Sequence, residues 1–379
     1  RERGLSLFLI DAGPQQPGVS ASSYYLAQEL RRLEMSFRYY IPEHSPLHRT
    51  ARIAELPVEP LRSRTERDVL GMWRLARAMK RSACHLVHAH DPVSQPLAAA
   101  AAARAKVPLQ VVTWDGTGTG GVIPSSRMKS FRALDMVIVR EEEAKERLTE
   151  QGFAPEAIRV IPQGRDFSPY TQPEARDFLH REFELGPDVR LIGVKTRFQG
   201  NQAWSILRRM KQTLEADLPG TRLAILGEGG LEAGGKGAVP PEGALFYMGG
   251  SEAFAQVITS LDMLVVLSSE PQDREQLQAA MAAGVLLATA TKRGLPRELV
   301  HEKTGLRFPS DDPSVLVRPL SAFVKNRELS SRLAREGQVA VLGKYSVQAM
   351  ARRLIKEYER IARRKGVSLD RTPVSEEPV

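Results

Sequence analysis

The sequence contains very little cysteine and no long hydrophobic run. Its 379 residues include one cysteine, Cys84, so no disulfide can form within the chain, and a reducing compartment fits. The longest apolar runs, LDMLVVL and PLAAAAAA, fall far short of the roughly 18 residues that a membrane-spanning helix needs. The first residues, RERGLSLFLI, lack a secretory signal pattern and predict a short tail and a strand. We therefore expect a cytoplasmic protein, with any membrane contact peripheral at the inner face.

Signals for nucleic-acid binding are also missing. The net charge of +9 favours anionic partners, which include phosphorylated ligands, anionic lipids and nucleic acids. However, no metal-finger spacing and no basic run interleaved with aromatic residues is present. We expect no nucleic-acid partner, and the sequence carries no signal for an oligomeric state.

Apolar runs of strand length alternate with amphipathic helical stretches along the whole chain. The alternation begins with LSLFLID and restarts near residue 170, at RLIGVK. Such alternation is typical of parallel sheets built from βαβ units. It predicts an α/β protein with two doubly wound, Rossmann-like domains that face each other across a cleft. The predicted parts are a first domain over 1–170, a second over 171–346, a helix over about 347–364 that returns to the first domain, and a disordered tail over 365–379.

Three loops of the first domain carry candidate site residues, because ligands of open parallel sheets bind beyond the carboxyl ends of the strands. Gly18 precedes a serine-rich helix start, where the backbone can approach a phosphate. His88 and His90 end a strand and lie on the same face of it, and no further metal ligands accompany them. Asp115 opens a glycine-rich loop and is a candidate acceptor contact. For each, an ordinary structural role is the alternative.

The second domain has three further candidate loops. Arg197 follows the first strand, where a guanidinium can bind a diphosphate. The GEGG turn contains Gly227 and Glu228, and it lacks the spacing of a dinucleotide motif. Glu270 precedes a helix that we expect to start near residues 271–273, so that the free N–H groups of its first turn face the ligand. Gln278 follows eight residues later; on one continuous helix the two would lie on nearly the same side.

These loops resemble, in order and spacing, those of the retaining GT-B-fold glycosyltransferases of group 1, or family 4. The resemblance covers roughly residues 5 to 362. Its individual motifs are unspecific, and their common order carries the weight. The segments that resemble the family are PGVSASSYYLAQEL, HLVHAHDP, IRVIPQGRDFSPY, LAILGEGG, LFYMGG, AAMAAGVLLATATKRGLPRELV and TGLRFPSDDP.

The resemblance implies transfer of a sugar from a nucleotide diphosphate sugar, such as a UDP- or GDP-sugar, with retention of configuration. No metal and no separate cofactor is implied. Donor-binding roles fall on Gly18, Arg197, Gln202, Gly227, Glu228, Glu270, Glu275 and Gln278. His90, Arg197 and Glu270 are the implied catalytic residues, and His88 and Asp115 lie on the acceptor side. The acceptor is a glycan, a lipid-linked molecule or another compound.

Several positions depart from the family pattern. Pro17 replaces the first of two glycines, Gln163 stands where asparagine is usual, and Gln202 replaces the lysine that binds the diphosphate. The second glutamate of the Glu-x7-Glu motif falls on Ala279 when the helix is aligned, and on Gln278 when counted from Glu270. Lys195 and Arg293 are nearby cations that could compensate.

Two functional hypotheses follow. The first is an active transferase with atypical donor contacts, and the second is an inactive homologue that acts as a binding or partner subunit. In addition, the basic segment 62–81 contains Trp73, Arg74 and Arg77, and such a helix can lie on an anionic membrane. An ordinary sheet-packing helix with a charged outer face is the alternative.

Overall fold

The chain folds into two compact units. The computed structural model describes residues 5–12, 22–61, 68–91, 94–114, 123–172, 176–195, 201–217, 219–226, 245–247, 251–267, 269–270, 273–308, 310 and 313–367. Unit 1 comprises Arg1–Arg165 and Tyr345–Val379, and unit 2 comprises Asp166–Lys344. The chain therefore leaves unit 1 after Arg165 and returns to it at Tyr345.

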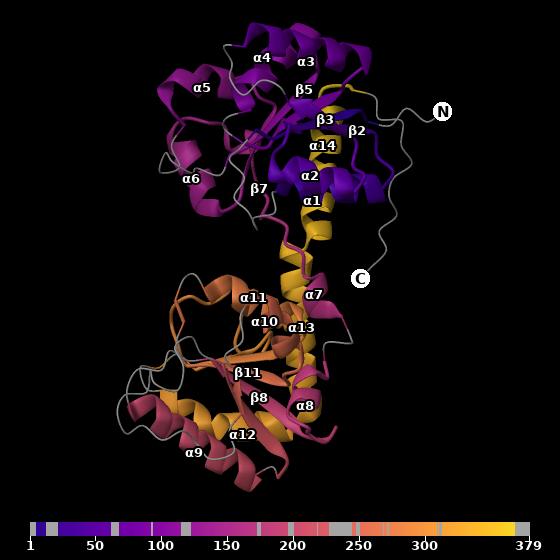
Figure 1. Cartoon of the computed structure of the whole chain (residues 1–379). Helices are drawn as coiled ribbons and strands as arrows, with labels where there is room; N and C mark the ends of the chain where they lie inside the picture. The colour runs from indigo at the N-terminus through magenta and orange to yellow at the C-terminus, as the bar shows by residue number, and fades with distance from the viewer. Residues whose placement is uncertain are drawn as a thin grey trace. The chain divides into compact units, whose positions relative to one another are not determined.

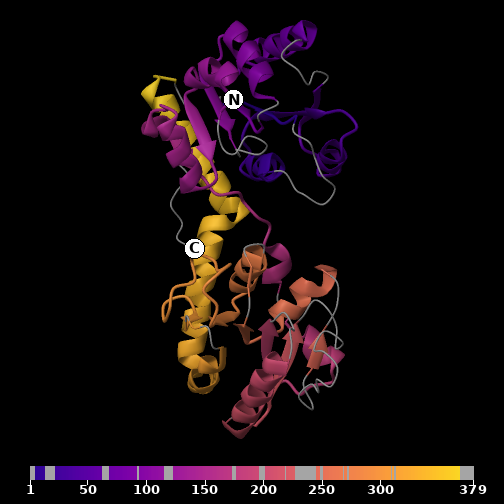
Figure 2. The ribbon, with the colours of Figure 1, turned by 90° about the vertical axis from the view of Figure 1, so that its left-hand side faces the viewer.

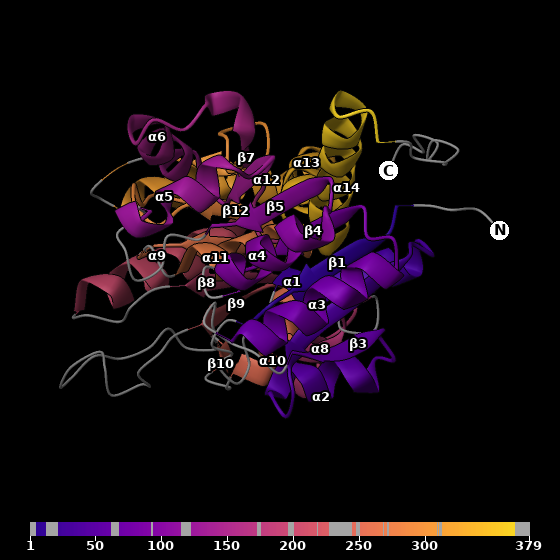
Figure 3. The same cartoon turned by 90° about the horizontal axis from the view of Figure 1, so that it is seen from above.

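Unit 1 is built on a parallel sheet, which in the described residues has the strand order β3-β2-β1-β4-β5-β6-β7. The order runs outward in both directions from the β1/β4 pair, so the switch point of a doubly wound sheet lies between these two strands. Figure 3 shows the strands from above. Their bounds are β1 Leu7–Ile10, β2 Phe37–Pro42, β3 Val58–Leu61, β4 Leu86–Ala89, β5 Leu109–Thr113, β6 Met136–Val139 and β7 Ile158–Val160.

Helices cover both faces of this sheet, which explains why its strands read as continuous apolar runs. Leu7 and Leu9 of β1 pack with α1, α2 and α14, whereas Phe8 and Ile10 pack with α3, α4, α5 and α6. The helices are labelled in Figure 1. Their bounds are α1 Ser22–Arg32, α2 Pro46–Ile53, α3 Val69–Arg81, α4 Gln95–Ala105, α5 Ser125–Arg132, α6 Glu142–Glu150 and α14 Val347–Arg364, with a 3-10 turn, η1, over Pro155–Ala157.

The last helix, α14, is part of the core of unit 1. Met350, Leu354, Tyr358 and Ile361 are all buried in the same cluster as Leu9 of β1. These residues recur at spacings of three and four, so they form one apolar stripe on the helix. Ser346 caps the helix by accepting a hydrogen bond from the N–H of Ala349. Figure 2 shows α14, in yellow, alongside the elements of unit 1.

Unit 2 repeats the doubly wound arrangement. Its described strands form a parallel sheet in the order β10-β9-β8-β11-β12-β13, so the switch point lies between β8 and β11. Together with unit 1, this confirms the predicted fold class of two parallel α/β sheets. The strand bounds are β8 Arg190–Lys195, β9 Thr221–Leu226, β10 Leu245–Tyr247, β11 Met263–Val266, β12 Leu286–Thr289 and β13 Leu306–Arg307.

The helices of unit 2 also lie on both faces of their sheet. Leu207 of α9, Leu320 of α12 and Leu333 of α13 are buried against the strands in one core cluster, while α10 contacts α7, α8 and α11. Their bounds are α7 Ser168–Thr171, α8 Phe178–Glu182, α9 Asn201–Asp217, α10 Ser251–Thr259, α11 Arg274–Ala282, α12 Val317–Lys325 and α13 Arg327–Tyr345, with a 3-10 turn, η5, over Pro313–Leu316. Within the described ranges, every helix is too short or too polar to cross a membrane.

Candidate active site

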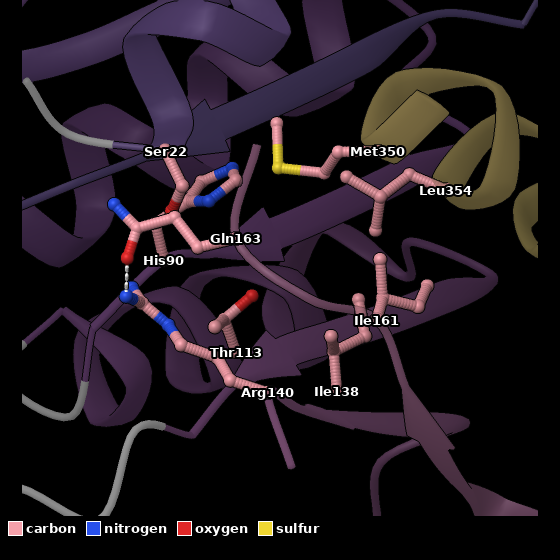
Figure 4. A pocket seen from close by; sticks show the side chains of 9 residues that line it. All are labelled: Ser22, His90, Thr113, Ile138, Arg140, Ile161, Gln163, Met350 and Leu354. Atoms are coloured by element: carbon pink, nitrogen blue, oxygen red, sulfur yellow. Dashed lines mark hydrogen bonds between the residues drawn. The ribbon is translucent and has the colours of Figure 1, made fainter. Parts of the chain in front are cut away.

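A small cavity lies at the carboxyl ends of the strands of unit 1. Its volume of about 20 Å³ is room for one water-sized group. Figure 4 shows the side chains around it, which come from the starts of α1 and α14 and from the ends of β4, β5, β6 and β7. They are Ser22, His90, Thr113, Ile138, Arg140, Ile161, Gln163, Met350 and Leu354. The cavity is next to the switch point and beyond the carboxyl ends of the strands, and it is at these ends that the sequence predicts a ligand.

His90 is a buried polar residue that lines this cavity. It directly follows β4, and its backbone N–H donates to the carbonyl of Ile10, at 2.8 Å. Its side chain is 8% exposed, and its Nε2 atom has no hydrogen-bond partner among the described residues. Burial, together with the nearby charge of Arg140, lowers the pKa of His90 to about 3. The imidazole is therefore neutral at neutral pH and can exchange hydrogen bonds with a ligand.

His88 lies directly behind His90. The two rings face each other with their centroids 3.8 Å apart, in agreement with the prediction that both side chains lie on one face of the strand. His88 is fully buried and does not line the cavity. Its Nδ1 lies 2.6 Å from the Tyr358 hydroxyl, and its Nε2 lies 2.9 Å from Oγ1 of Thr113. Both nitrogens are thus occupied within unit 1.

Arg140 and Gln163 close another side of the cavity. Arg140 directly follows β6, Gln163 follows β7, and the guanidinium donates to the amide oxygen of Gln163. Figure 4 shows this bond beside His90. Arg140 therefore brings a positive charge to the cavity. Arg140 is not among the residues predicted from the sequence, and the strand order β5-β6-β7 is what places it here.

Asp91 secures the backbone around His90. Its Oδ2 accepts hydrogen bonds from the N–H of Ala12, at 2.8 Å, and from the hydroxyl of Ser94, at 2.6 Å. Its Oδ1 accepts from the N–H of Ser94, at 2.9 Å. One buried carboxylate therefore ties the end of β1, the end of β4 and the start of α4 together. Sequence reasoning missed this role, although the HAHDP stretch that contains Asp91 was a visible signal.

In unit 2, Glu270 lies at the corresponding switch point. Its N–H donates to Oδ2 of Asp273, at 2.8 Å, and its carbonyl accepts from the N–H of Asp273, at 2.9 Å. Asp273 Oδ1 lies 3.3 Å from Nζ of Lys195, the last residue of β8, and Lys195 also donates to Gln276 of α11, at 3.2 Å. Lys195, proposed from the sequence as a compensating cation, is thus placed beside the start of α11.

The start of α11 lacks a side-chain cap. Asp273 is its N-cap residue but forms no side-chain capping bond, because the carboxylate is turned toward Lys195 and the Glu270 N–H. The helix begins at Arg274, so Glu270 precedes it, as predicted. The spacing of eight between Glu270 and Gln278 therefore does not correspond to two turns of one helix.

The other predicted residues of α11 differ in exposure. Glu275 is exposed in the first turn, whereas Gln278 and Ala279 are buried at 5% and 4% exposure. Gln278 therefore contributes to the packed side of α11. Of the remaining predictions, Gly18, Asp115, Arg197, Gly227 and Glu228 lie outside the described residues, as does the side chain of Gln202. Among the described residues, no three His, Cys, Asp or Glu side chains come together as a metal site.

The comparison with known families bears on the unit that contains the cavity. Residues 17–168 match the model of Glycosyltransferase Family 4. This Family 4 match spans the strands that carry His90, Thr113, Arg140 and Gln163. No curated protein matches the sequence.

Solved structures share the fold over nearly the whole chain. A glycosyltransferase from Rickettsia africae aligns with a TM-score of 0.61 at 13% identity, covering 94% of this chain and 98% of that one. Anabaena HepE in complex with UDP aligns with 0.57 at 14%, covering 94% and 100%. The UDP-GlcNAc 2-epimerase from Neisseria meningitidis, bound to UDP-GlcNAc, aligns with 0.53 at 10%, covering 94% and 99%. With the Family 4 match, these alignments confirm the resemblance to the GT-B glycosyltransferases.

Proposed function

We propose that the protein is a glycosyltransferase that moves a sugar from a nucleotide diphosphate sugar to a glycan, a lipid-linked molecule or another acceptor, with retention of configuration and without a metal ion. The observation that carries the proposal is the position of His90. A neutral, buried imidazole with an unoccupied Nε2 lines a cavity at the switch point of a sheet that matches Glycosyltransferase Family 4. The HepE complex with UDP, which has the same fold, supports a nucleotide donor.

In this proposal unit 1 binds the acceptor, and His90 contacts the transferred sugar. Because the pKa of His90 is lowered to about 3, its part is to hold a hydroxyl and not to donate a proton as an acid. Unit 2 binds the donor. The bond between the sugar and the diphosphate breaks, the acceptor oxygen bonds to the same sugar carbon, and the acceptor proton passes to the departing diphosphate. The start of α11 and Lys195 would stabilise the negative charge that develops there.

The alternative is an inactive homologue that binds a partner. It is favoured by Gln202 and Ala279, which replace two charged residues of the family pattern. Each lost charge-assisted hydrogen bond costs about 1.5–3 kcal/mol. Because about 1.4 kcal/mol is a factor of ten, two losses weaken donor binding about a hundredfold or more. Against this alternative, Lys195 is the candidate replacement cation; it lies beside the start of α11, where it pairs with Asp273.

We also propose that α3 touches the inner face of an anionic membrane. Val69, Leu70 and Trp73 are 56%, 69% and 48% exposed, and they lie on the first turns of the helix. The exposed bases Arg74, Arg77, Lys80 and Arg81 follow on the same helix. Exposed apolar side chains beside a cluster of cations suit the headgroup region of such a membrane.

Thermal unfolding with nucleotides tests the main proposal. The panel is uridine, guanosine, adenosine, cytidine and thymidine diphosphates, with and without attached sugars, on the wild type and on Arg197→Ala. Arg208→Ala, which changes an exposed arginine of α9, is the matched control. Binding at a hundredfold excess over Kd adds about 2.7 kcal/mol, which raises Tm by roughly 5–10 °C for a unit of this size.

The outcomes separate the hypotheses. A shift with one base, lost in Arg197→Ala and kept in Arg208→Ala, supports a donor site. No shift at millimolar nucleotide supports the inactive homologue. If a nucleotide sugar binds, analysis of the products separates sugar transfer or release from epimerisation, the activity named for the Neisseria structure.

A further inference from the structure

Three buried side chains of unit 1 form a chain of hydrogen bonds that ends at the cavity. The Tyr358 hydroxyl of α14 lies 2.6 Å from Nδ1 of His88, and Nε2 of His88 lies 2.9 Å from Oγ1 of Thr113. Tyr358 and His88 are fully buried, and Thr113 is 7% exposed. Only Thr113 lines the cavity, where it is accompanied by His90. Each hydroxyl and each ring nitrogen of this hydrogen-bond chain can donate or accept, so two opposite directions of donation are possible.

The direction is fixed at Tyr358. Burial raises the pKa of Tyr358 well above its usual value, so the hydroxyl keeps its proton. Tyr358 is surrounded by apolar core residues, and among the described residues its hydroxyl has no hydrogen-bond partner other than His88. If Tyr358 accepted from His88, its own proton would be buried without an acceptor, which costs about 1–3 kcal/mol. Tyr358 therefore donates to Nδ1 of His88.

The tautomer of His88 follows from this. Burial lowers the pKa of His88 well below its usual value, and the neighbouring His90 adds to this effect, so the ring carries one proton. Because Nδ1 accepts from Tyr358, that proton is on Nε2. Nε2–H then donates to Oγ1 of Thr113.

The hydroxyl proton of Thr113 is left to point elsewhere. No other hydrogen bond joins Oγ1 of Thr113 to the described residues. Its remaining neighbourhood is the cavity, where Nε2 of His90 is a fully buried polar atom without a hydrogen-bond partner in the described part of the chain. Two polar atoms thus meet at a space for one water-sized group. A sugar hydroxyl fits both, because its oxygen accepts from Thr113 and bonds to Nε2 in either tautomer of His90.

We propose that Thr113 is a further substrate-binding residue, which donates a hydrogen bond to a hydroxyl oxygen of the bound sugar or acceptor, and that His88 and Tyr358 are positioning residues that fix this direction. The identity of the ligand rests on the proposed function. The direction of donation along the hydrogen-bond chain does not rest on that function, since it follows from the buried donors and acceptors alone. Thr113 thereby acts as an obligate donor, which selects an oxygen that can accept.

The first experiment records the histidine nitrogens by NMR in the full chain without substrate. The expected result is a His88 with a protonated Nε2 and a hydrogen-bonded Nδ1, assigned through the signal that moves in Tyr358→Phe. Tyr24→Phe, which removes a tyrosine hydroxyl that bonds to Gln28 on α1, is the control and should leave this signal in place. A proton on Nδ1 of His88 in the wild type would overturn the inference, whatever activity the protein has.

The second experiment uses steady-state kinetics with the donor identified above. Thr113→Val should lower kcat/KM by about 5- to 100-fold, which corresponds to about 1–3 kcal/mol, while Thr113→Ser should stay within about threefold. Tyr358→Phe should lower kcat/KM less than Thr113→Val does. In protein that already carries Thr113→Val, adding Tyr358→Phe should cause no further loss of kcat/KM, because Tyr358 acts through Thr113.

The two experiments fail in different ways. Independent, multiplying losses from Tyr358→Phe and Thr113→Val would show a general structural effect and overturn the positioning role. Wild-type protein that neither binds nor turns over any donor would refute the proposed function, whereas the NMR result would still decide the direction of the chain.

Discussion

Lowering the pH should destabilise unit 1 through His90. The imidazole binds a proton near pH 6.5 in the unfolded chain but only near pH 3 in the folded protein. Between these values the unfolded state holds more protons, so the stability of unit 1 falls as the pH falls and is recovered above about pH 6.5. The cause is structural, because the charged imidazole would be buried beside the charge of Arg140.

The magnitude follows from the two pKa values. At pH 7 the His90 side chain is mostly neutral in the unfolded chain as well, so the stability of unit 1 is close to the maximum that His90 allows. At pH 5 the unfolded state binds the proton and the folded state does not, which lowers the free energy of unfolding of unit 1 by about 2 kcal/mol. This is a large share of the 5–15 kcal/mol that stabilises a typical domain. His88, whose pKa is also lowered, acts in the same direction in the wild type.

The assay compares the wild type with His90→Gln by urea unfolding at pH 7 and pH 5. Both carry Trp204→Phe, so that the remaining tryptophans, Trp73 and Trp114, belong to unit 1 and report its unfolding. The wild type should lose about 2 kcal/mol more than His90→Gln on acidification, because Gln does not titrate. Equal losses in the two proteins would refute the reasoning that burial keeps His90 neutral.

Three further predictions concern unit 2 and α3. Gly294→Ala should displace Glu270 and lower kcat/KM for the donor tenfold or more, because a Cβ at this position, where φ is +65°, would lie 2.3 Å from the Glu270 carbonyl oxygen. Lys195→Met should raise KM for the donor about tenfold, because it leaves the Asp273 carboxylate uncompensated beside a diphosphate, and steady-state kinetics will measure both. Leu70→Ser should reduce sedimentation with anionic liposomes, since Leu70 is 69% exposed on α3.

Each of these has a matched comparison. The Cβ added by Gly186→Ala meets no atom within 4 Å, so this variant should keep its activity. If it lost as much kcat/KM as Gly294→Ala does, the loss could not be assigned to a displaced Glu270. Lys195→Arg should restore part of the affinity, and a failure to do so would count against the role of charge. Ser22→Ala changes α1 and is the reference, which should bind liposomes as the wild type does. If Leu70→Ser also binds them as the wild type does, a membrane contact through α3 is excluded.

The strands with continuous apolar runs were predictable from the sequence. The run RLIGVK coincides with β8 and the run LSLFLID contains β1, because burial on both faces of a parallel sheet favours apolar residues within a strand. In contrast, β3 contains Pro60 and lies at the edge of its sheet, where proline is tolerated but the pattern of a strand is weak. The helix α2 is only eight residues long, too short for an apolar period to stand out.

The site was predictable only where a residue ends a strand. His90 could be found because it directly follows a strand, and Glu270 because it follows an apolar run after two serines. The chain from Thr113 through His88 to Tyr358 could not, since it joins positions 25 and 270 residues apart that follow no common period. The ion pair of Lys195 with Asp273 likewise depends on the pairing of β8 with β11, which the spacing along the chain does not contain.

The return of α14 to unit 1 affects the order in which the protein can fold during synthesis. Unit 2 is one continuous stretch and can fold as soon as it has left the ribosome, whereas unit 1 needs Met350, Leu354 and Tyr358 to complete its core. The roughly 180 residues of unit 2 are synthesised before α14. At about 5–20 residues per second this takes on the order of 10–35 s. During that time the face of the unit 1 sheet that α14 later covers is exposed, so we expect a nascent chain stopped at residue 344 to bind chaperones there and one stopped well beyond residue 364 to be released. Equal chaperone occupancy of the two stalled chains would show that unit 1 folds without its last helix.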